Sequence, residues 1–138
     1  MSDVLLCPSA RPEMPDARLF GVRREFGGAA FIQHLADPLP VSAEILALAG
    51  NAPVGEIFRF SAPCAESACQ HFDGARCRLA AKIAALPDTV AAVPPCRIRP
   101  TCRWYVQEGS AACFRCPLIL SETANPSVRL AHAADPSR

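Results

Sequence analysis

The 138-residue sequence has little lysine, few aromatic residues and no long apolar run. Lysine occurs once, at Lys82, and arginine occurs thirteen times. We attribute this bias first to genomic base composition and only second to recognition of a binding partner. No apolar run reaches the roughly eighteen residues of a membrane span, and the first residues lack the basic and apolar regions of a signal peptide. The net charge of +1 gives no global signal for nucleic acid. We therefore expect a cytoplasmic protein that does not enter a membrane.

The sequence also lacks the common catalytic motifs. It contains no phosphate-binding loop, no dinucleotide fingerprint and no nucleophile elbow. Glu108 and Asp73 are too isolated to predict a general acid–base pair. The sequence therefore identifies no catalytic residue and leaves open whether the protein is an enzyme.

The length fits one domain, which we expect over residues 1–122, with a ββαβ unit in residues 1–62. Three prolines predict an irregular segment over 1–16. A hairpin is predicted over 17–35, since Gly27-Gly28 supplies the positive φ of a tight turn. A short helix follows, with Ser42 as N-cap and Gly50 after its end, and a third strand is predicted over 54–61, with Phe58 and Phe60 on one face.

The second half, residues 63–122, is rich in cysteine and loops. Asp73 predicts a helix over 74–86, and a second short helix is expected around 101–112. Residues 123–138 contain little to bury, so a disordered tail is expected there. Together the two halves predict an α+β fold in which the ββαβ unit packs on a half stabilised by metal or cluster binding.

Cysteine density is the strongest signal in the sequence. Seven of the eight cysteines fall in the 53 residues from Cys64 to Cys116, beside proline and arginine rather than inside apolar runs. In the cytoplasm disulfides are uncommon, and clustered cysteines more often bind metal or do redox chemistry. We therefore expect one or two cysteine-ligated centres.

The spacing divides the cysteines into two predicted sites. The C-terminal site comprises Cys96, Cys102, Cys113 and Cys116. Its Cys113-Phe-Arg-Cys116-Pro117 segment resembles the Cys-x2-Cys and Cys-Pro elements of ferredoxin-type cluster loops. The N-terminal site comprises Cys64, Cys69 and Cys77, with the fourth position left to Cys7 or His71.

Irregular spacing favours [4Fe-4S] clusters over zinc, because zinc folds usually present two Cys-x2-4-Cys knuckles and this chain has one. Local charge agrees: from Arg76 to Arg115 seven basic residues face Asp88 and Glu108, a net charge of +5. Arginines beside the cysteines would offset an anionic cluster, namely Arg97, Arg99, Arg103 and Arg115. Zinc and redox-active cysteines stay open as alternatives.

Two segments carry a resemblance to a known group: Cys96-Arg-Ile-Arg-Pro-Thr-Cys102-Arg-Trp-Tyr, and Gln107-Glu108-Gly followed by Cys113-x2-Cys116-Pro. In these, over about residues 64–120 and at Cys7-Pro-Ser-Ala-Arg-Pro, the chain is similar to small uncharacterised bacterial cysteine-rich proteins loosely labelled as associated with nitrogen fixation. The resemblance implies metal or cluster binding in bacteria and supplies no activity.

The leading function predicted is an iron–sulfur protein in electron transfer or redox and iron sensing, with a redox partner protein. The alternatives are a zinc-stabilised module that binds protein or nucleic acid, and an enzyme using an open cluster iron or a reactive thiol such as Cys7. Trp104-Tyr105 are expected to fill the core beside a site, and His34 and His132 to lie at the surface or in the tail. The oligomeric state stays open.

Overall fold

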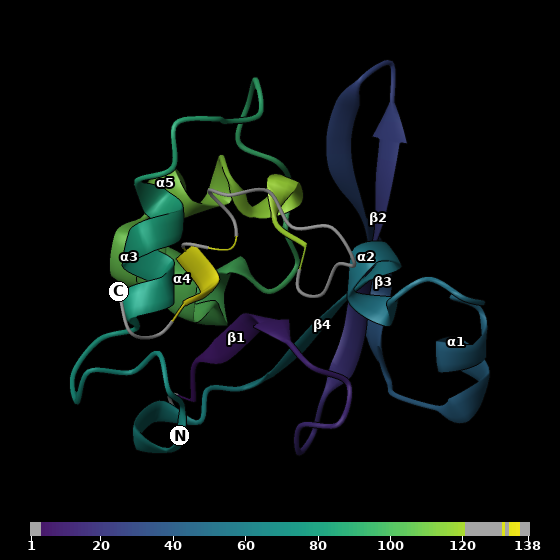
Figure 1. Cartoon of the computed structure of the whole chain (residues 1–138), viewed down its shortest axis with the longest axis horizontal. Coiled ribbons are helices and arrows are strands. Elements are labelled where there is room, and N and C mark those ends of the chain that lie inside the picture. The colour runs from purple at the N-terminus through teal and green to yellow at the C-terminus, as the bar shows by residue number, and fades with distance from the viewer. Residues whose placement is uncertain (1–3, 121–130, 132, 136–138) are drawn as a thin grey trace.

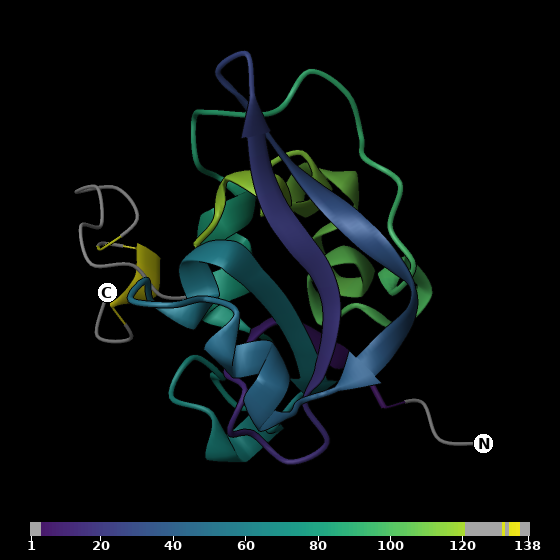
Figure 2. The same ribbon diagram turned by 90° about the vertical axis from the view of Figure 1, so that its right-hand side faces the viewer.

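A four-stranded antiparallel sheet separates two layers of short helices in the computed structural model, which describes residues 4–120, 131 and 133–135 (Figure 1). One layer is the cysteine-rich half, and the other is formed by two short helices on the opposite side of the strands. In the view of Figure 2 the long hairpin of the sheet crosses in front of the cysteine-rich helices. The predicted α+β class is confirmed.

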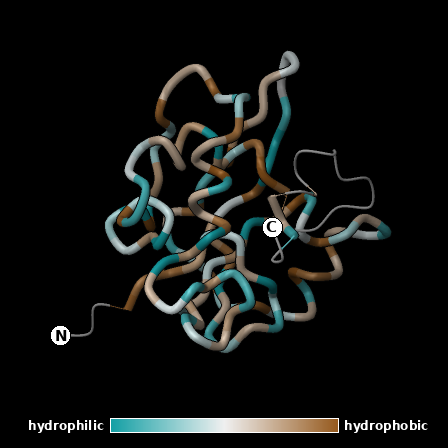
Figure 3. Tube along the Cα trace, turned by 60° about the vertical axis from the view of Figure 1, so that its left-hand side comes forward, coloured by the Kyte–Doolittle hydropathy of each residue, from teal (hydrophilic) through white to brown (hydrophobic). Residues whose placement is uncertain are grey.

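The strands are β1 (Leu6–Ala10), β2 (Arg18–Phe26), β3 (Ala29–Pro40) and β4 (Phe58–Pro63), in the spatial order β1-β4-β2-β3. The predicted hairpin is confirmed as β2 and β3. Gly27 and Gly28 form its turn with φ of +59° and +81°, values that L-residues with a Cβ rarely adopt. Its outer end is hydrophilic along β2 (Figure 3).

The first strand was not expected, because residues 1–16 were predicted to be irregular. β1 pairs with β4 and places Cys7 opposite Ala62. Pro8 lacks an N–H, but β1 lies at the edge of the sheet, where one side of the strand needs no partner. Proline therefore does not exclude the strand.

Two short helices follow the hairpin, α1 (Ala43–Ala47) and α2 (Val54–Ile57). The predicted cap is confirmed: the Ser42 side chain accepts a hydrogen bond from the Ile45 N–H at 3.2 Å. The strand predicted over 54–61 is wrong in its first half. Residues 54–57 form a helical turn instead, in which the Glu56 N–H bonds to the Pro53 carbonyl at 3.0 Å.

The cysteine-rich half contains α3 (Arg78–Ala84), α4 (Arg103–Glu108), α5 (Ser110–Cys113) and three short 3-10 turns, η1 (Glu66–Ala68), η2 (Arg99–Thr101) and η3 (Cys116–Leu118). The helix predicted over 74–86 begins later, because the Asp73 carboxylate accepts the N–H groups of Ala75 and Arg76 in a separate turn. Cys77, expected inside the helix, is its N-cap.

The sheet buries two faces in two cores. Leu19, Phe58 and Phe60 lie in the core under α1 and α2, which confirms the shared face predicted for the two phenylalanines. Phe20 lies in the other core with Trp104 and Ile83 of the cysteine-rich half. Because successive side chains of a strand point to opposite faces, Arg59 lies on the face of β4 opposite Phe58 and Phe60.

Most of the tail predicted to be disordered lies outside the described residues. Within it, Ala133 is described and buried, and Lys82 of α3 donates to the carbonyl of Asp135 at 2.7 Å. Among the described residues no helix has the length and apolar character needed to cross a membrane.

Candidate functional site

All eight cysteines belong to the described part of the chain, and all eight are free thiols. The thiols that act electrostatically on Cys7, Cys77, Cys96 and Cys102 divide the eight cysteines into two sets of four. The thiol of Cys7 is influenced by Cys77, Cys64 and Cys69, and that of Cys77 by Cys69 and Cys64. We call these four residues group A. They unite the three cysteines of the predicted N-terminal site with Cys7.

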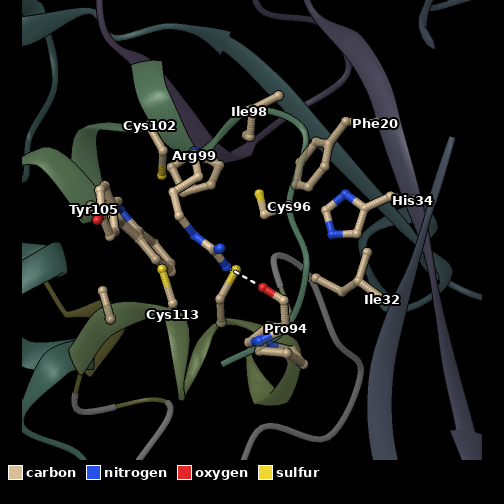
Figure 4. A pocket seen from close by; sticks show the side chains of 15 residues that line it. Phe20, Ile32, His34, Pro94, Cys96, Ile98, Arg99, Cys102, Tyr105 and Cys113 are labelled. Carbon is tan, nitrogen blue, oxygen red and sulfur yellow. Dashed lines mark hydrogen bonds between the residues drawn. The ribbon is translucent and has the colours of Figure 1, made fainter. Parts of the chain in front are cut away.

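The second set, group B, comprises Cys96, Cys102, Cys113 and Cys116. Cys96 is influenced by Cys116 and Cys113, and Cys102 by Cys116 and Cys96. All four residues line one cavity between the cysteine-rich half and the sheet (Figure 4). These are the residues that spacing assigned to the C-terminal site.

Strand β1 lies between the two groups. Its Cys7 belongs to group A, while the next residue, Pro8, lines the cavity of group B. The strand is fixed to both: the Cys64 N–H bonds to the Leu5 carbonyl at 2.8 Å, and Leu6 forms a parallel bridge with Cys102. One extended strand thus forms a wall of each site.

Group A is assembled from three different kinds of local structure. Cys64 follows β4, Cys69 ends η1, and Cys77 caps α3. The side chain of Gln107 from α4 holds the backbone of Cys77, accepting from its N–H and donating to its carbonyl, both at 2.8 Å. The last of these cysteines is therefore positioned from the neighbouring helix.

Group B is built from turns that bring the cysteines to one cavity. Cys102 caps α4, Cys113 ends α5, and Cys116 begins η3. The helix predicted around 101–112 is divided between α4 and α5 at Gly109, whose φ of +70° breaks the helical path. This break turns the chain back so that both ends of the α4–α5 segment reach the cavity.

Backbone amides point at several of the sulfurs. The His71 N–H lies 3.4 Å from Cys69 Sγ, and the Ala80 N–H lies 3.4 Å from Cys77 Sγ. Amide donors stabilise a thiolate over a thiol, and hydrogen bonds to sulfur are one means of tuning iron–sulfur clusters.

The most unusual residue at group B is Arg59, which is fully buried. Its guanidinium donates to the Pro8 carbonyl at 2.7 and 3.2 Å, to the Cys116 carbonyl at 2.7 Å and to Cys116 Sγ at 3.3 Å. The ion pairs among described residues include none with Arg59. Burying a cation without an anion costs free energy. Negative charge on the neighbouring sulfurs would therefore stabilise Arg59 in this position.

The cavity of group B is lined mainly by apolar surface and is partly open to solvent. It measures about 30 Å³, more than the ~10–15 Å³ that one water molecule needs. Figure 4 shows Phe20, Ile32 and His34 on one side and Cys102, Tyr105 and Cys113 on the other, with Arg99 reaching between them. The thiols therefore surround a space instead of packing against one another.

Burial raises the pKa of the Cys7 thiol to about 12, and burial raises that of Cys102 to about 12 as well. The pKa values of Cys77 and Cys96 are also raised, again mainly by burial. A nucleophilic thiol needs a lowered pKa, so Cys7 has the opposite property. Binding a cation would convert these thiols to thiolates.

The histidines and the tryptophan singled out in the sequence differ in their positions relative to the two groups. The His71 N–H donates to Cys69 Sγ, and the pKa of the His71 side chain is lowered by burial and by Lys82 and Arg78. His34, expected at the surface, lines the cavity of group B and contacts Phe20 with ring centroids 5.6 Å apart. Trp104 is fully buried beside group B, as expected of a core residue, whereas Tyr105, also expected in the core, is 37% exposed.

Of the four arginines expected to balance charge, only Arg99 lines the group B cavity. Arg97 is exposed and lies 3.9 Å from Asp37, Arg103 pairs with Glu66, and Arg115 donates to the carbonyls of Leu86 and Ala111.

Sequence reasoning missed Arg59. Its available signal was a charged residue between the two phenylalanines Phe58 and Phe60.

Among the described residues, no three or more cysteine, histidine, aspartate or glutamate side chains are arranged to hold a single metal ion. Comparison with protein-family models, curated proteins and solved structures finds no match to this chain.

Proposed function

We propose that this chain is an iron–sulfur protein that binds two [4Fe-4S] clusters, one at group A and one at group B, and serves electron transfer or redox and iron sensing. The observation that carries the proposal is the division of eight free thiols into two sets of four. Four thiolates complete the coordination of a four-iron cluster. When bound, such a cluster accepts and releases single electrons.

The surroundings of the thiols support a polynuclear, anionic occupant. At group B the cysteines line a cavity, which suits a cluster that lies between its ligands. Arg59 brings a buried positive charge to Cys116, and Arg99 brings a second to the same cavity. Backbone N–H groups donate to sulfur at group A, and the Arg59 guanidinium donates to sulfur at group B. The residues present therefore fit the group proposed.

Group A is proposed to be closed by Cys7 rather than by His71. Cys7 lies within electrostatic reach of the other three thiols, whereas the pKa of His71 responds to Lys82 and Arg78. With four cysteine ligands no iron is left open for substrate. This favours an electron carrier or a sensor over an enzyme that uses an open cluster iron.

Compartment and partner follow from the same chemistry. Eight free thiols suit the reducing cytoplasm, which we propose as the location. We also propose a redox partner protein that exchanges single electrons with the clusters. We also propose that the chain is related to the small bacterial cysteine-rich proteins that it resembles in sequence.

The test is anaerobic reconstitution of the full chain, followed by measurement of iron, zinc and acid-labile sulfide. We expect a brown protein with about four iron and four sulfide for each group. Replacing Cys7 with Ala removes one group A ligand and should halve the content, as should Cys102→Ala in group B. His71→Ala is the matched control and should keep the full content.

Other outcomes change the assignment in defined ways. If Cys7→Ala keeps its iron content and His71→Ala loses iron, His71 and not Cys7 is the fourth ligand of group A. A colourless chain that holds about one or two zinc ions and no sulfide would overturn the cluster proposal in favour of a zinc module.

A further inference from the structure

The two groups differ in the fixed charge beside them. Group B has Arg59, which is fully buried, and Arg99, which lines its cavity. At group A the nearby arginine, Arg103, is neutralised by Glu66, with the two side chains 3.2 Å apart. Glu66 itself lies in η1, between Cys64 and Cys69 of that group. Arg78, which follows Cys77, also brings positive charge to group A, but its hydrogen bond to the Gln70 carbonyl, at 3.1 Å, is exposed to solvent. The fully buried positive charge is thus on the group B side.

Arg59 is held rigidly. Four hydrogen bonds fix its guanidinium to the backbone of Pro8 and to the carbonyl and sulfur of Cys116. The group also lies over the ring of Phe20, 5.8 Å from the ring centroid. An arginine stays charged at every accessible pH, so this cation cannot be removed by deprotonation.

We infer that Arg59 sets the reduction potential at group B above that at group A, so that the singly reduced protein carries its electron at group B. The inference rests on the proposed function, since it concerns clusters at both groups. Reduction adds negative charge, and a fixed cation and an N–H···S bond both stabilise the more negative state. Burial strengthens this effect because little water screens the charge.

A purely structural arginine would satisfy its donors with carbonyls alone. Three of the four bonds of Arg59 do so, but the fourth reaches Cys116 Sγ. Removing a structural residue changes stability, whereas removing Arg59 should also change the potential of one centre and leave the other unchanged. The potential is therefore the readout that separates the two roles.

The experiment is an anaerobic redox titration of the reconstituted full chain with dithionite as the one-electron source, followed by absorption and electron paramagnetic resonance. The Cys7→Ala variant assigns the signals, because it keeps only group B. We expect two steps in the wild type, with group B reduced first. In Arg59→Met the group B potential should fall by at least 59 mV, a tenfold change in the equilibrium constant of a one-electron couple.

Two further variants make the result specific. Arg97→Met removes the same charge from a side chain that is 59% exposed, where water screens it, and should leave both potentials unchanged. Arg59→Lys keeps the positive charge but lacks the planar N–H donors of the guanidinium, so it should give a group B potential between those of the wild type and Arg59→Met. The Lys variant also provides the test if the Met variant does not fold.

The outcomes separate the two claims. A wild-type chain without acid-labile sulfide would overturn the proposed function and this inference together. Two clusters with an unchanged group B potential in both Arg59 variants, or with group A reduced first in the wild type, would overturn the role of Arg59 alone.

Discussion

Slow alkylation of half-buried Cys7 and buried Cys102 follows directly from the structure. Burial raises the pKa of Cys7 and of Cys102 from 9.0 to about 12. The reactive species is the thiolate, so a rise of about three units lowers the reactive fraction at pH 8 by about a thousandfold. In the metal-free, reduced chain we expect these two thiols to react with iodoacetamide about a thousand times more slowly than in the denatured chain.

The assay is a time course of alkylation at pH 8, with each cysteine followed by mass spectrometry after digestion. The same chain in urea is the reference, because there every thiol has the reactivity of an unstructured peptide. Modification of Cys7 and Cys102 at the reference rate in the folded chain would refute the reasoning, since it would mean that neither thiol is held away from water.

The same cause predicts how stability depends on pH. The folded-state pKa of Cys102 lies above its unfolded value, so the folded state binds the proton more tightly. Its contribution is fully present below about pH 9 and is lost as the pH rises towards 12. The loss amounts to at most about 4 kcal/mol for three pKa units. Urea unfolding of the metal-free chain at pH 8 and pH 10 should therefore show lower stability at the higher pH.

Three substitutions test the packing around the groups. Gln107→Ala removes both side-chain hydrogen bonds to the backbone at the start of α3 and should lower the free energy of unfolding by about 1–3 kcal/mol. Metal analysis should show a lower content at group A and an unchanged content at group B. Trp104→Ala, in the core, should cost about 3–5 kcal/mol in urea unfolding, and a similar cost for the control Tyr105→Ala, 37% exposed, would contradict the burial argument. Gly21→Ala should cost about 1–3 kcal/mol, because its Cβ would lie 2.4 Å from Ile32 Cγ2; an unchanged urea midpoint would show that the strands separate easily.

Local signals in the sequence predicted the local elements well. Gly27-Gly28 marked the hairpin and Ser42 marked the start of α1, because a turn and a cap depend on residues that are neighbours in the chain. The composition of group B was also accessible, since its cysteines lie within 21 consecutive residues, from Cys96 to Cys116. Spacing brought the same four residues together that the fold does.

Features that depend on distant pairing were not predictable in this way. β1 exists because it pairs with β4, more than fifty residues away, and its proline is tolerated only because the strand lies at the edge. The partners of Arg59 lie in β1 and η3, so the sequence of β4 alone does not predict its burial. His34 likewise faces group B only because β3 passes beside the cysteine-rich half.

The position of β1 makes the two groups unequal as cross-links. The cysteines of group B lie within 21 residues, whereas those of group A span 71, from Cys7 to Cys77. Closing the longer loop costs about 1 kcal/mol more chain entropy. A ligand at group B therefore organises a short segment that is already compact, while a ligand at group A ties the start of the chain to its middle. During synthesis Cys7 precedes the other three cysteines of group A, so this site cannot be completed until Cys77 has been added.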